Sequence, residues 1–315
     1  MKEIISDFLV MTKQGLYCAT GNFHIDPTSS VKTAVISHAH GDHACRNNVT
    51  VYCTPPTQAF MKSRYGKASG HEFRLFEYFQ SFDVGGVKIT FISAGHILGS
   101  AQILLEYKNV SYLYTGDYKV QPDPTCTPID YFRADVLITE STFANPTTHH
   151  PSDVEEIKKL NTFSDNVLLG AYGLGKAQRL NYLINKYCPQ KAVHLHYSIL
   201  PIHRVYEQYG VDFLRYSPYE RKALKSNLEN QIYIVPPLTF NSYFRATNLK
   251  KVFASGWERL QRNNDMSLYI SDHVDWGEIL EYICVVDPIE IWTLHGDGKY
   301  LEEHFHAKVP VKILN

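Results

Sequence analysis

Residues 37–44 read Ser-His-Ala-His-Gly-Asp-His-Ala, directly after a short apolar run. Four metal-binding side chains fall within six positions of this segment: His38, His40, Asp42 and His43. On a strand followed by a tight turn, the two alternate histidines point the same way, and Asp42 and His43 face a second point nearby. Because four such groups packed together would repel or stay unsatisfied without a cation, the segment predicts a site for two metal ions.

Five more ligand-type side chains stand at the ends of apolar runs that are typical of buried strands. They are His96, Asp117, Glu140, His273 and His295. Strand ends present rigid, convergent side chains, while the strand interiors supply the packing that fixes them. We therefore expect these five residues to take part in the same site.

Composition narrows the class of protein. The chain has 315 residues, of which 44% are hydrophobic and 20% charged, and it has no apolar stretch near the ~20 residues of a membrane span. The first residues lack the long apolar region of a secretory signal, so we expect a soluble, cytoplasmic protein.

Six scattered cysteines without a C-x-x-C pair argue against a cysteine zinc knuckle and a disulfide framework. With a net charge of −1, a polyanionic partner would have to be held locally.

The pattern of the chain changes near residues 145–153. The part before it is rich in strands, whereas strands then alternate with helix-like segments at 152–161 and 175–187. Ser152, with Glu155 three positions later, predicts a capping box at the first of these helices. Most of the 22 tyrosines and 16 phenylalanines are expected in the core, although some could stack against single-stranded bases.

The order H-x-H-x-D-H, then Gly-His, then Gly-Asp resembles the metallo-β-lactamase fold. The segments "ITESTF" (138–143), "SDHVDW" (271–276) and "LHG" (294–296) resemble the further motifs of its β-CASP branch, whose members cut nucleic acids. The resemblance implies an α/β protein with a four-layer αββα sandwich and an inserted, smaller β-CASP-like α/β lobe. The core would comprise 1–148 and 264–315, and the lobe 149–263.

Within this branch, "AGHILGSAQ" (94–102), "GDYK" (116–119) and "LGKAQR" (174–179) are similar to segments of the bacterial ligase-associated DNA exonucleases. That resemblance implies a hydrolase for DNA repair, a 5′ exonuclease acting on single-stranded DNA through a metal-activated hydroxide. It also implies a functional association with an ATP-dependent DNA ligase and a helicase.

The resemblance further implies a role for each ligand. His38, His40 and His96 would bind one divalent ion, while Asp42, His43 and His295 would bind a second, with Asp117 bridging both; Asp42 and Asp117 are thus catalytic candidates. Imidazole and carboxylate ligands suit zinc or manganese, and iron is not excluded.

Other residues would act beside the ions. Asp26 would orient the histidine ligands, and Glu140 would fix the tautomer of His273, so that His273 protonates the leaving 3′-oxygen. Lys176 and Arg179 follow a glycine-rich turn that could bind a substrate phosphate, or could simply pack a strand against a helix. Lys119 is likewise either a phosphate contact or a surface lysine.

Three other functions remain open from the sequence. An RNA-processing nuclease of the same branch would share the three motifs. A small-molecule hydrolase of the same fold is disfavoured because such chains are shorter and lack the segment at about 149–263. A scaffold without activity is disfavoured because every ligand position is filled.

Overall fold

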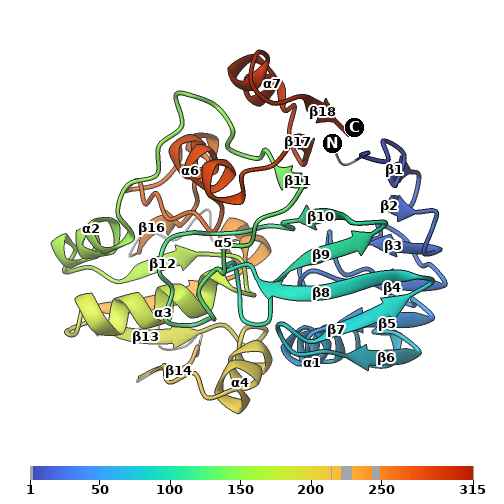
Figure 1. Cartoon of the computed structure of the whole chain (residues 1–315). Helices are drawn as coiled ribbons and strands as arrows, with labels where there is room; N and C mark the ends of the chain where they lie inside the picture. The colour runs from blue at the N-terminus through green and yellow to red at the C-terminus, as the bar shows by residue number, and fades with distance from the viewer. Residues whose placement is uncertain (1–2, 214, 221–228, 243–248, 315) are drawn as a thin grey trace. The chain divides into compact units, whose positions relative to one another are not determined.

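The computed structural model describes residues 3–213, 215–220, 229–242 and 249–314 (Figure 1). The chain divides into two compact units. The first comprises residues 1–122, 126–149 and 273–315, and the second comprises 123–125 and 150–272. Each unit has its own sheets and its own hydrophobic core.

The first unit contains two sheets. One has the order β1-β2-β3-β4-β5-β6: β1 (Leu9–Thr12), β2 (Gly15–Cys18), β3 (Phe23–Ile25), β4 (Thr33–Val35), β5 (Thr50–Cys53) and β6 (Glu72–Leu75). The other has the order β18-β17-β11-β10-β9-β8-β7: β18 (Val311–Ile313), β17 (Glu290–Leu294), β11 (Val136–Glu140), β10 (Val110–Tyr114), β9 (Ala101–Tyr107), β8 (Val87–Ser93) and β7 (Ser81–Val84). In each sheet one half is parallel and the other antiparallel.

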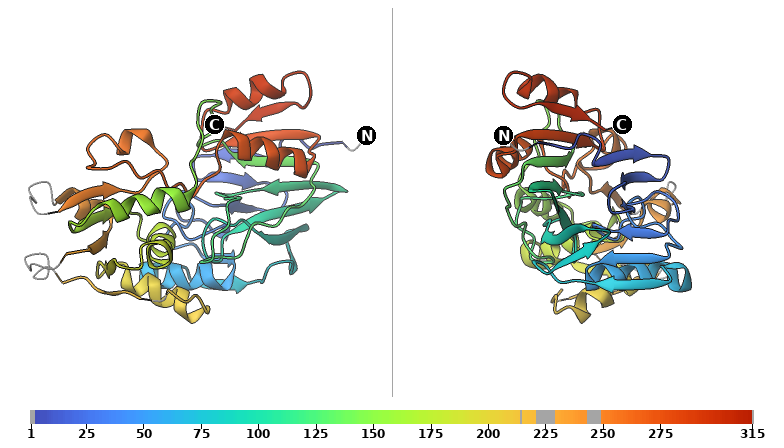
Figure 2. Two further views of the ribbon diagram at one scale, coloured as in Figure 1. Left: turned by 90° about the vertical axis from the view of Figure 1, so that its left-hand side faces the viewer. Right: turned by 45° about the vertical axis from the view of Figure 1, so that its right-hand side comes forward.

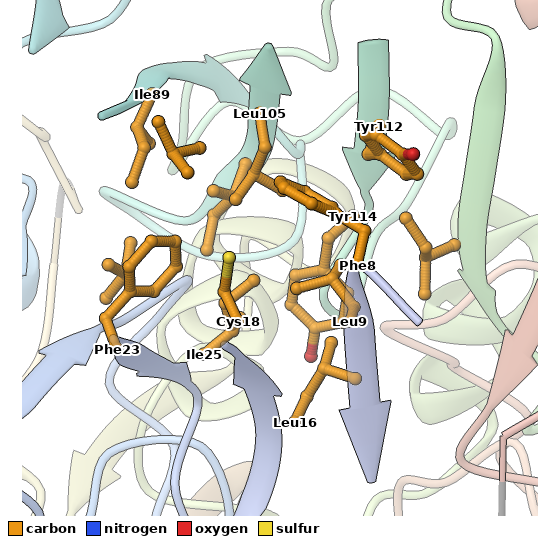
Figure 3. Packing of buried hydrophobic residues seen from close by; sticks show 14 of the residues in the cluster. Phe8, Leu9, Leu16, Cys18, Phe23, Ile25, Ile89, Leu105, Tyr112 and Tyr114 are labelled. Carbon is orange, nitrogen blue, oxygen red and sulfur yellow. The ribbon is translucent and has the colours of Figure 1, made fainter. Parts of the chain in front are cut away.

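The two sheets face each other across a layer of mostly apolar side chains. Leu16, Cys18 and Phe23 of the first sheet pack against side chains such as Ile89 and Leu105 of the second (Figure 3). Because side chains alternate along a strand, every second residue of β8 and β9 enters this layer and the others face the opposite side. This alternation fixes the register of the strands and hence the level at which each one ends.

Helices cover the outer faces of both sheets. Helix α1 (Pro55–Tyr65) lies against β6, and Thr54 caps it by accepting a hydrogen bond from the amide of Thr57. Helices α6 (Trp276–Val286) and α7 (Lys299–Phe305) pack on the second sheet. The predicted four-layer αββα sandwich is therefore confirmed.

The second unit is a parallel α/β sheet with the order β14-β13-β15-β12-β16: β14 (Ser217–Pro218), β13 (Ala192–Leu195), β15 (Gln231–Val235), β12 (Val167–Gly170) and β16 (Lys250–Phe253) (Figure 2). One face packs on α2 (Asp153–Lys158) and α3 (Lys176–Tyr187), and the other on α5 (Pro237–Ser242); α4 (Leu200–Gln208) follows β13. A sheet that is buried on both faces explains why these strands read as continuous apolar runs.

The predicted capping box at Ser152 was wrong. The helix does begin at the next residue, but the Ser152 side chain makes no capping hydrogen bond, and Glu155 instead accepts one from Lys158 at 2.9 Å. The acidic residues of this short helix are used for ion pairs rather than for its own amides. In the part of the chain that the structure describes, no helix is long and apolar enough to cross a bilayer.

A buried histidine should make the stability of the second unit depend on pH. His203 is 0% exposed, and its Nδ1 lies 2.9 Å from Nε2 of Gln178 on α3. Burial lowers the pKa of His203 from its ordinary value, about 6.5, to about 3. Since the folded pKa is lowered, the unfolded chain binds the extra proton first, and stability that is complete above about pH 6.5 is lost as the pH falls.

We expect this group to cost about 2 kcal/mol of unfolding free energy between pH 7 and pH 5. Urea unfolding of the whole chain at both pH values, compared with His203→Gln, measures it. The variant should lose that part of the pH dependence, and an unchanged pH dependence would show that folding does not lower the pKa of His203.

Candidate metal centre

The histidine-rich segment leaves the first sheet at the end of β4 and closes into a turn. The amides of His43 and Ala44 both donate to the carbonyl of His40, at 3.2 and 2.8 Å. His38 and His43 are buried, at 0% and 1% exposure, whereas the Asp42 side chain is 77% exposed. The turn therefore aims its two buried rings inward.

Three imidazole rings meet at one point. His40 Nδ1 lies 3.1 Å from Nε2 of His38 and 3.1 Å from Nε2 of His96. His96 follows β8 through Gly95, whose φ is 69° and where a Cβ atom would lie 2.4 Å from the carbonyl oxygen of Lys119. Only glycine fits this approach, which brings the ring of His96 to the histidine-rich turn.

Asp117 places its two carboxylate oxygens toward different histidines. Oδ2 lies 3.5 Å from Nε2 of His38 and 3.8 Å from Nε2 of His96, whereas Oδ1 lies 3.3 Å from Nε2 of His43. Asp117 stands just after β10, behind Gly116, where a Cβ would come within 2.9 Å of the Ser37 side chain. The glycine lets the two loops approach closely enough for one carboxylate to contact both groups.

The other two residues expected at the second ion lie near His43. The carboxylate of Asp42 comes within 3.9 Å of His43 Nε2, and the ring of His295, at the end of β17, lies 5.1 Å from that of His43. Both Asp42 and His295 are exposed. The structure thus brings His38, His40, His43, His96 and Asp117 together, and it places Asp42 and His295 on the exposed side, next to His43.

Asp26 orients the buried His43. Its Oδ2 lies 2.8 Å from His43 Nδ1 and accepts a hydrogen bond from the hydroxyl of Tyr114 at 3.0 Å. The amide and hydroxyl of Ser37 donate to the same carboxylate. With its oxygens used in this way, Asp26 can fix the ring of His43 and leave Nε2 directed at Asp117.

The sequence analysis did not single out Ser37 and Tyr114 as site residues. Ser37 also contacts His38, with Oγ 3.0 Å from Nδ1. A signal was present: Ser37 adjoins the first histidine, and Tyr114 ends the strand that leads to Asp117, with its polar tip buried.

Glu140 and His273 form a pair beside this centre. His273 Nδ1 lies 2.9 Å from Oε2 and 3.1 Å from Oε1 of Glu140, which is 2% exposed. The amide of Tyr118 donates to Glu140 and holds it in place. His273 itself is 26% exposed in its side chain, and its ring centroid lies 5.3 Å from that of His96.

The charges of the centre depend on one another. Burial lowers the pKa of His38 well below its ordinary range, and its cationic neighbour His43 adds to the effect. Burial alone would raise the pKa of Asp117 and lower that of His43, but their mutual attraction reverses both: the pKa of Asp117 is held well below, and that of His43 well above, the ordinary values. The ionised carboxylate of Asp117 and the neutral imidazole of His38 are donors of the kind that divalent ions prefer.

The geometry fits a metal ion. His40 Nδ1 carries at most one hydrogen, so it cannot satisfy both ring nitrogens that approach it at 3.1 Å. Nitrogen ligands about 2.0–2.1 Å from a tetrahedral ion lie about 3.3 Å from one another, close to these separations. His38, His40, His96 and Asp117 together offer four ligand atoms within 4.8 Å of one another.

The three lysine and arginine candidates are all buried. Lys119 is 1% exposed and lies in the first unit. Lys176 and Arg179, at 3% and 2%, lie in the second unit, where Lys176 is 3.2 Å from Asp272 and Arg179 pairs with several carboxylates. In the glycine-rich turn before α3, the amide of Gly175 donates a hydrogen bond to the side-chain oxygen of Gln178, at 2.7 Å. A phosphate role for these residues stays a prediction.

Comparison with known proteins finds relatives of two kinds. A protein of Opitutus terrae named "Probable DNA ligase" is 30% identical over 304 residues, which cover 91% of this chain and 29% of that protein. An RNase J-like protein of Methanocaldococcus jannaschii is 29% identical, covering 56% of this chain and 49% of the relative. The endoribonuclease Ysh1 of Schizosaccharomyces pombe is 32% identical over 50% of this chain and 26% of its own length.

The chain thus spans less than half the length of these relatives. No family model matches it. Among solved structures, a protein of unknown function from Enterococcus faecalis has a TM-score of 0.63 at 14% sequence identity, over 90% of this chain and 79% of that one. This likeness supports the fold.

The Asp26 carboxylate offers a test of how the centre is held. We expect Asp26→Asn to weaken binding of divalent metal about 10- to 100-fold, because the ring of His43 loses its anionic partner. Competition with a chelating dye measures the affinity, with the exposed Glu303→Gln as the control. Equal affinities in the two variants would show that Asp26 does not orient the metal ligands.

The charge network around Arg179 offers a second test, which separates a structural role from phosphate binding. Removing the cation in Arg179→Met leaves Asp123, Asp153 and Asp272 without it, so we expect a loss of about 3–5 kcal/mol in unfolding free energy. The exposed Arg204→Met should change it by less than about 0.5 kcal/mol. A variant of unchanged stability that binds substrate more weakly would instead support the phosphate role.

Proposed function

Because this chain belongs to the β-CASP branch of the metallo-β-lactamase fold, we propose that it is a metal-dependent phosphodiesterase that degrades nucleic acid. The observation that carries the proposal is the position of Asp117, with one carboxylate oxygen toward His38 and His96 and the other toward His43. One carboxylate shared by two groups of imidazoles is the arrangement that holds two divalent ions side by side.

We assign the metal ligands accordingly. His38, His40 and His96 would hold one ion and His43, Asp42 and His295 the other, with Asp117 between them. When bound, two such ions lower the pKa of water and neutralise charge on a phosphate. Zinc, manganese and iron all suit this set of ligands.

The remaining step falls to the chain's own side chains. Glu140 accepts a hydrogen bond from Nδ1 of His273, which leaves Nε2 of the partly exposed ring as the atom that can carry a proton to the leaving oxygen. Asp26 keeps Nε2 of His43 directed at the centre. Asp42 and Asp117 contribute the negative charge that favours cations there.

We propose single-stranded DNA as the substrate, cut from the 5′ end, with a role in DNA repair. In its favour, the relative named a DNA ligase aligns with 91% of this chain, whereas the relatives named for ribonuclease activity align with 50–56%. The same match supports a functional association with a DNA ligase, and the resemblance extends that association to a helicase. An RNA-processing nuclease is the second candidate, because several relatives carry such names.

The test uses single-stranded DNA and RNA of one sequence, each labelled at the 5′ or the 3′ end, with Mn²⁺ or Zn²⁺ added to metal-stripped protein. We expect degradation of DNA with early release of the 5′ label, and loss of at least about 10³-fold in rate for Asp117→Asn and His40→Ala. The exposed Glu303→Gln is the matched control.

Cleavage of RNA alone would favour the second candidate and keep the metal site. Full activity of Asp117→Asn would contradict the assignment of the site. Release of the 3′ label first would contradict the proposed polarity.

A further inference from the structure

Exposed apolar side chains gather at one edge of the second unit. Five of its described residues are large, apolar and exposed: Tyr172, Tyr197, Tyr209, Leu238 and Trp257. Four of them lie just after β12, β13, β15 and β16: Tyr172, Tyr197 and Trp257 stand in loops, and Leu238 stands in the first turn of α5. Their exposed fractions are 49% for Tyr172, 74% for Tyr197, 87% for Leu238 and 37% for Trp257. We call these four residues the carboxyl edge.

The register of the sheet brings the four loops to one level. Gly170 at the end of β12 pairs with Val235 of β15 and with Phe253 of β16, and Leu195 of β13 pairs with Ile234 of β15. Neighbouring strands lie about 4.8 Å apart, so four successive strands place their loops along a row of about 15 Å. Ligands of parallel α/β sheets bind outside this end of the strands.

Ring contacts support the aromatic side chains of the carboxyl edge, and the histidine beside Tyr197 is itself held by hydrogen bonds. The ring centroid of Tyr197 lies 4.1 Å from that of His196, and His196 contacts Ser198 at 2.8 Å and Thr239 of α5 at 3.4 Å. Such contacts give the exposed rings a fixed support. A rigid aromatic surface loses little conformational entropy when a ligand binds to it.

Two further rings are supported in the same way. Tyr172 meets the ring of Phe253 edge-on, with centroids 6.2 Å apart. The guanidinium of Arg259 lies 4.9 Å from the ring centroid of Trp257, so a positive charge stands beside the indole. Aromatic faces next to arginine are typical of surfaces that bind single-stranded nucleic acid.

The charge of the second unit favours the same partner. Residues 123–125 and 150–272 contain sixteen lysines and arginines against twelve aspartates and glutamates, whereas the remainder has fifteen against twenty. The net charge of −1 for the whole chain therefore hides a basic sequence in this unit, and its excess of four positive charges, at positions 221, 222, 225 and 245, lies outside the described residues. Such an excess attracts a polyanion, while the rings supply contacts that do not depend on charge.

We propose that the carboxyl edge is a stacking platform for the bases of a single-stranded nucleic acid. The inference rests on the proposed function and adds where the strand is held. Tyr172, Tyr197 and Trp257 each present a ring face to a base, and Leu238 fills the apolar surface between them. Because every base has such a face, the platform accepts a strand of any sequence, as a degrading enzyme requires.

The experiment measures binding of a fluorescein-labelled oligothymidylate by anisotropy. It uses protein that carries Asp117→Asn, so that the strand is not consumed. Trp257→Ala and Tyr197→Ala should each raise the Kd about 5- to 100-fold, the equivalent of losing one stacked base. Trp257→Phe and Tyr197→Phe should retain binding, and so should Tyr209→Ala, whose exposed ring lies outside the carboxyl edge.

An abasic strand of the same length separates stacking from attraction to phosphate. It should bind weakly, and equally so to the parent protein and to the alanine variants. Unchanged oligothymidylate binding by both alanine variants would overturn the platform, even if the edge proved to bind a protein instead.

Hydrolysis of bis-4-nitrophenyl phosphate tests the proposed function separately. For this assay the platform variants are made in protein that keeps Asp117. The platform variants should cleave this small diester at the parent rate, whereas Asp117→Asn should not cleave it. If Asp117→Asn cleaves the diester normally, the proposed function fails whatever the binding results. If Asp117→Asn does not cleave the diester and the alanine variants still bind the strand normally, only the platform proposal fails.

Discussion

A single buried carboxylate, that of Asp117, constrains the architecture of the first unit. An ionised carboxyl group at 6% exposure is costly unless cationic partners or hydrogen bonds surround it. Here imidazoles from two segments distant in sequence do so, His38 and His43 from one and His96 from the other. The strands must therefore end at matching levels, and glycines at positions 95 and 116 must allow the loops to approach one another.

Support for this carboxylate extends outward through hydrogen bonds. Tyr114 and Ser37 hold Asp26, Asp26 holds His43, and His43 faces Asp117. The hydroxyl of Tyr114 comes from the strand that leads to Asp117, so one strand positions both the carboxylate and a support of its partner. Buried polar networks of this kind are rigid when every member is satisfied, and rigidity is what a metal centre needs to keep its ligands in place.

The second unit uses buried charge for a different purpose. Arg179 pairs with Asp123, Asp153 and Asp272, which lie where the chain enters or leaves this unit. A network that joins the three crossing points ties the ends of the unit to its central helix α3. Asp272 directly precedes His273, so this anchoring and the Glu140 pair act on neighbouring residues of one segment. The carboxyl edge of the sheet in this unit stays exposed and, in our proposal, binds the bases of the strand.

The sequence by itself determined the nature of the centre and the class of the fold. Four ligand-type side chains within six positions, and five more at strand ends, predict a metal centre from local spacing alone, and the alternation of apolar residues defines the strands that carry them. The fate of Lys176 and Arg179 was decided only by the tertiary structure. The sequence of a glycine-rich turn before a helix is the same whether the basic residues that follow it bind phosphate or are buried in the fold. Their burial depends on segments far away along the chain. Asp123 and Asp272 illustrate this, since they meet Arg179 from positions 56 residues before it and 93 after it.

The row of exposed rings at the carboxyl edge also required the fold, since only the order of parallel strands places the segments after four strands side by side.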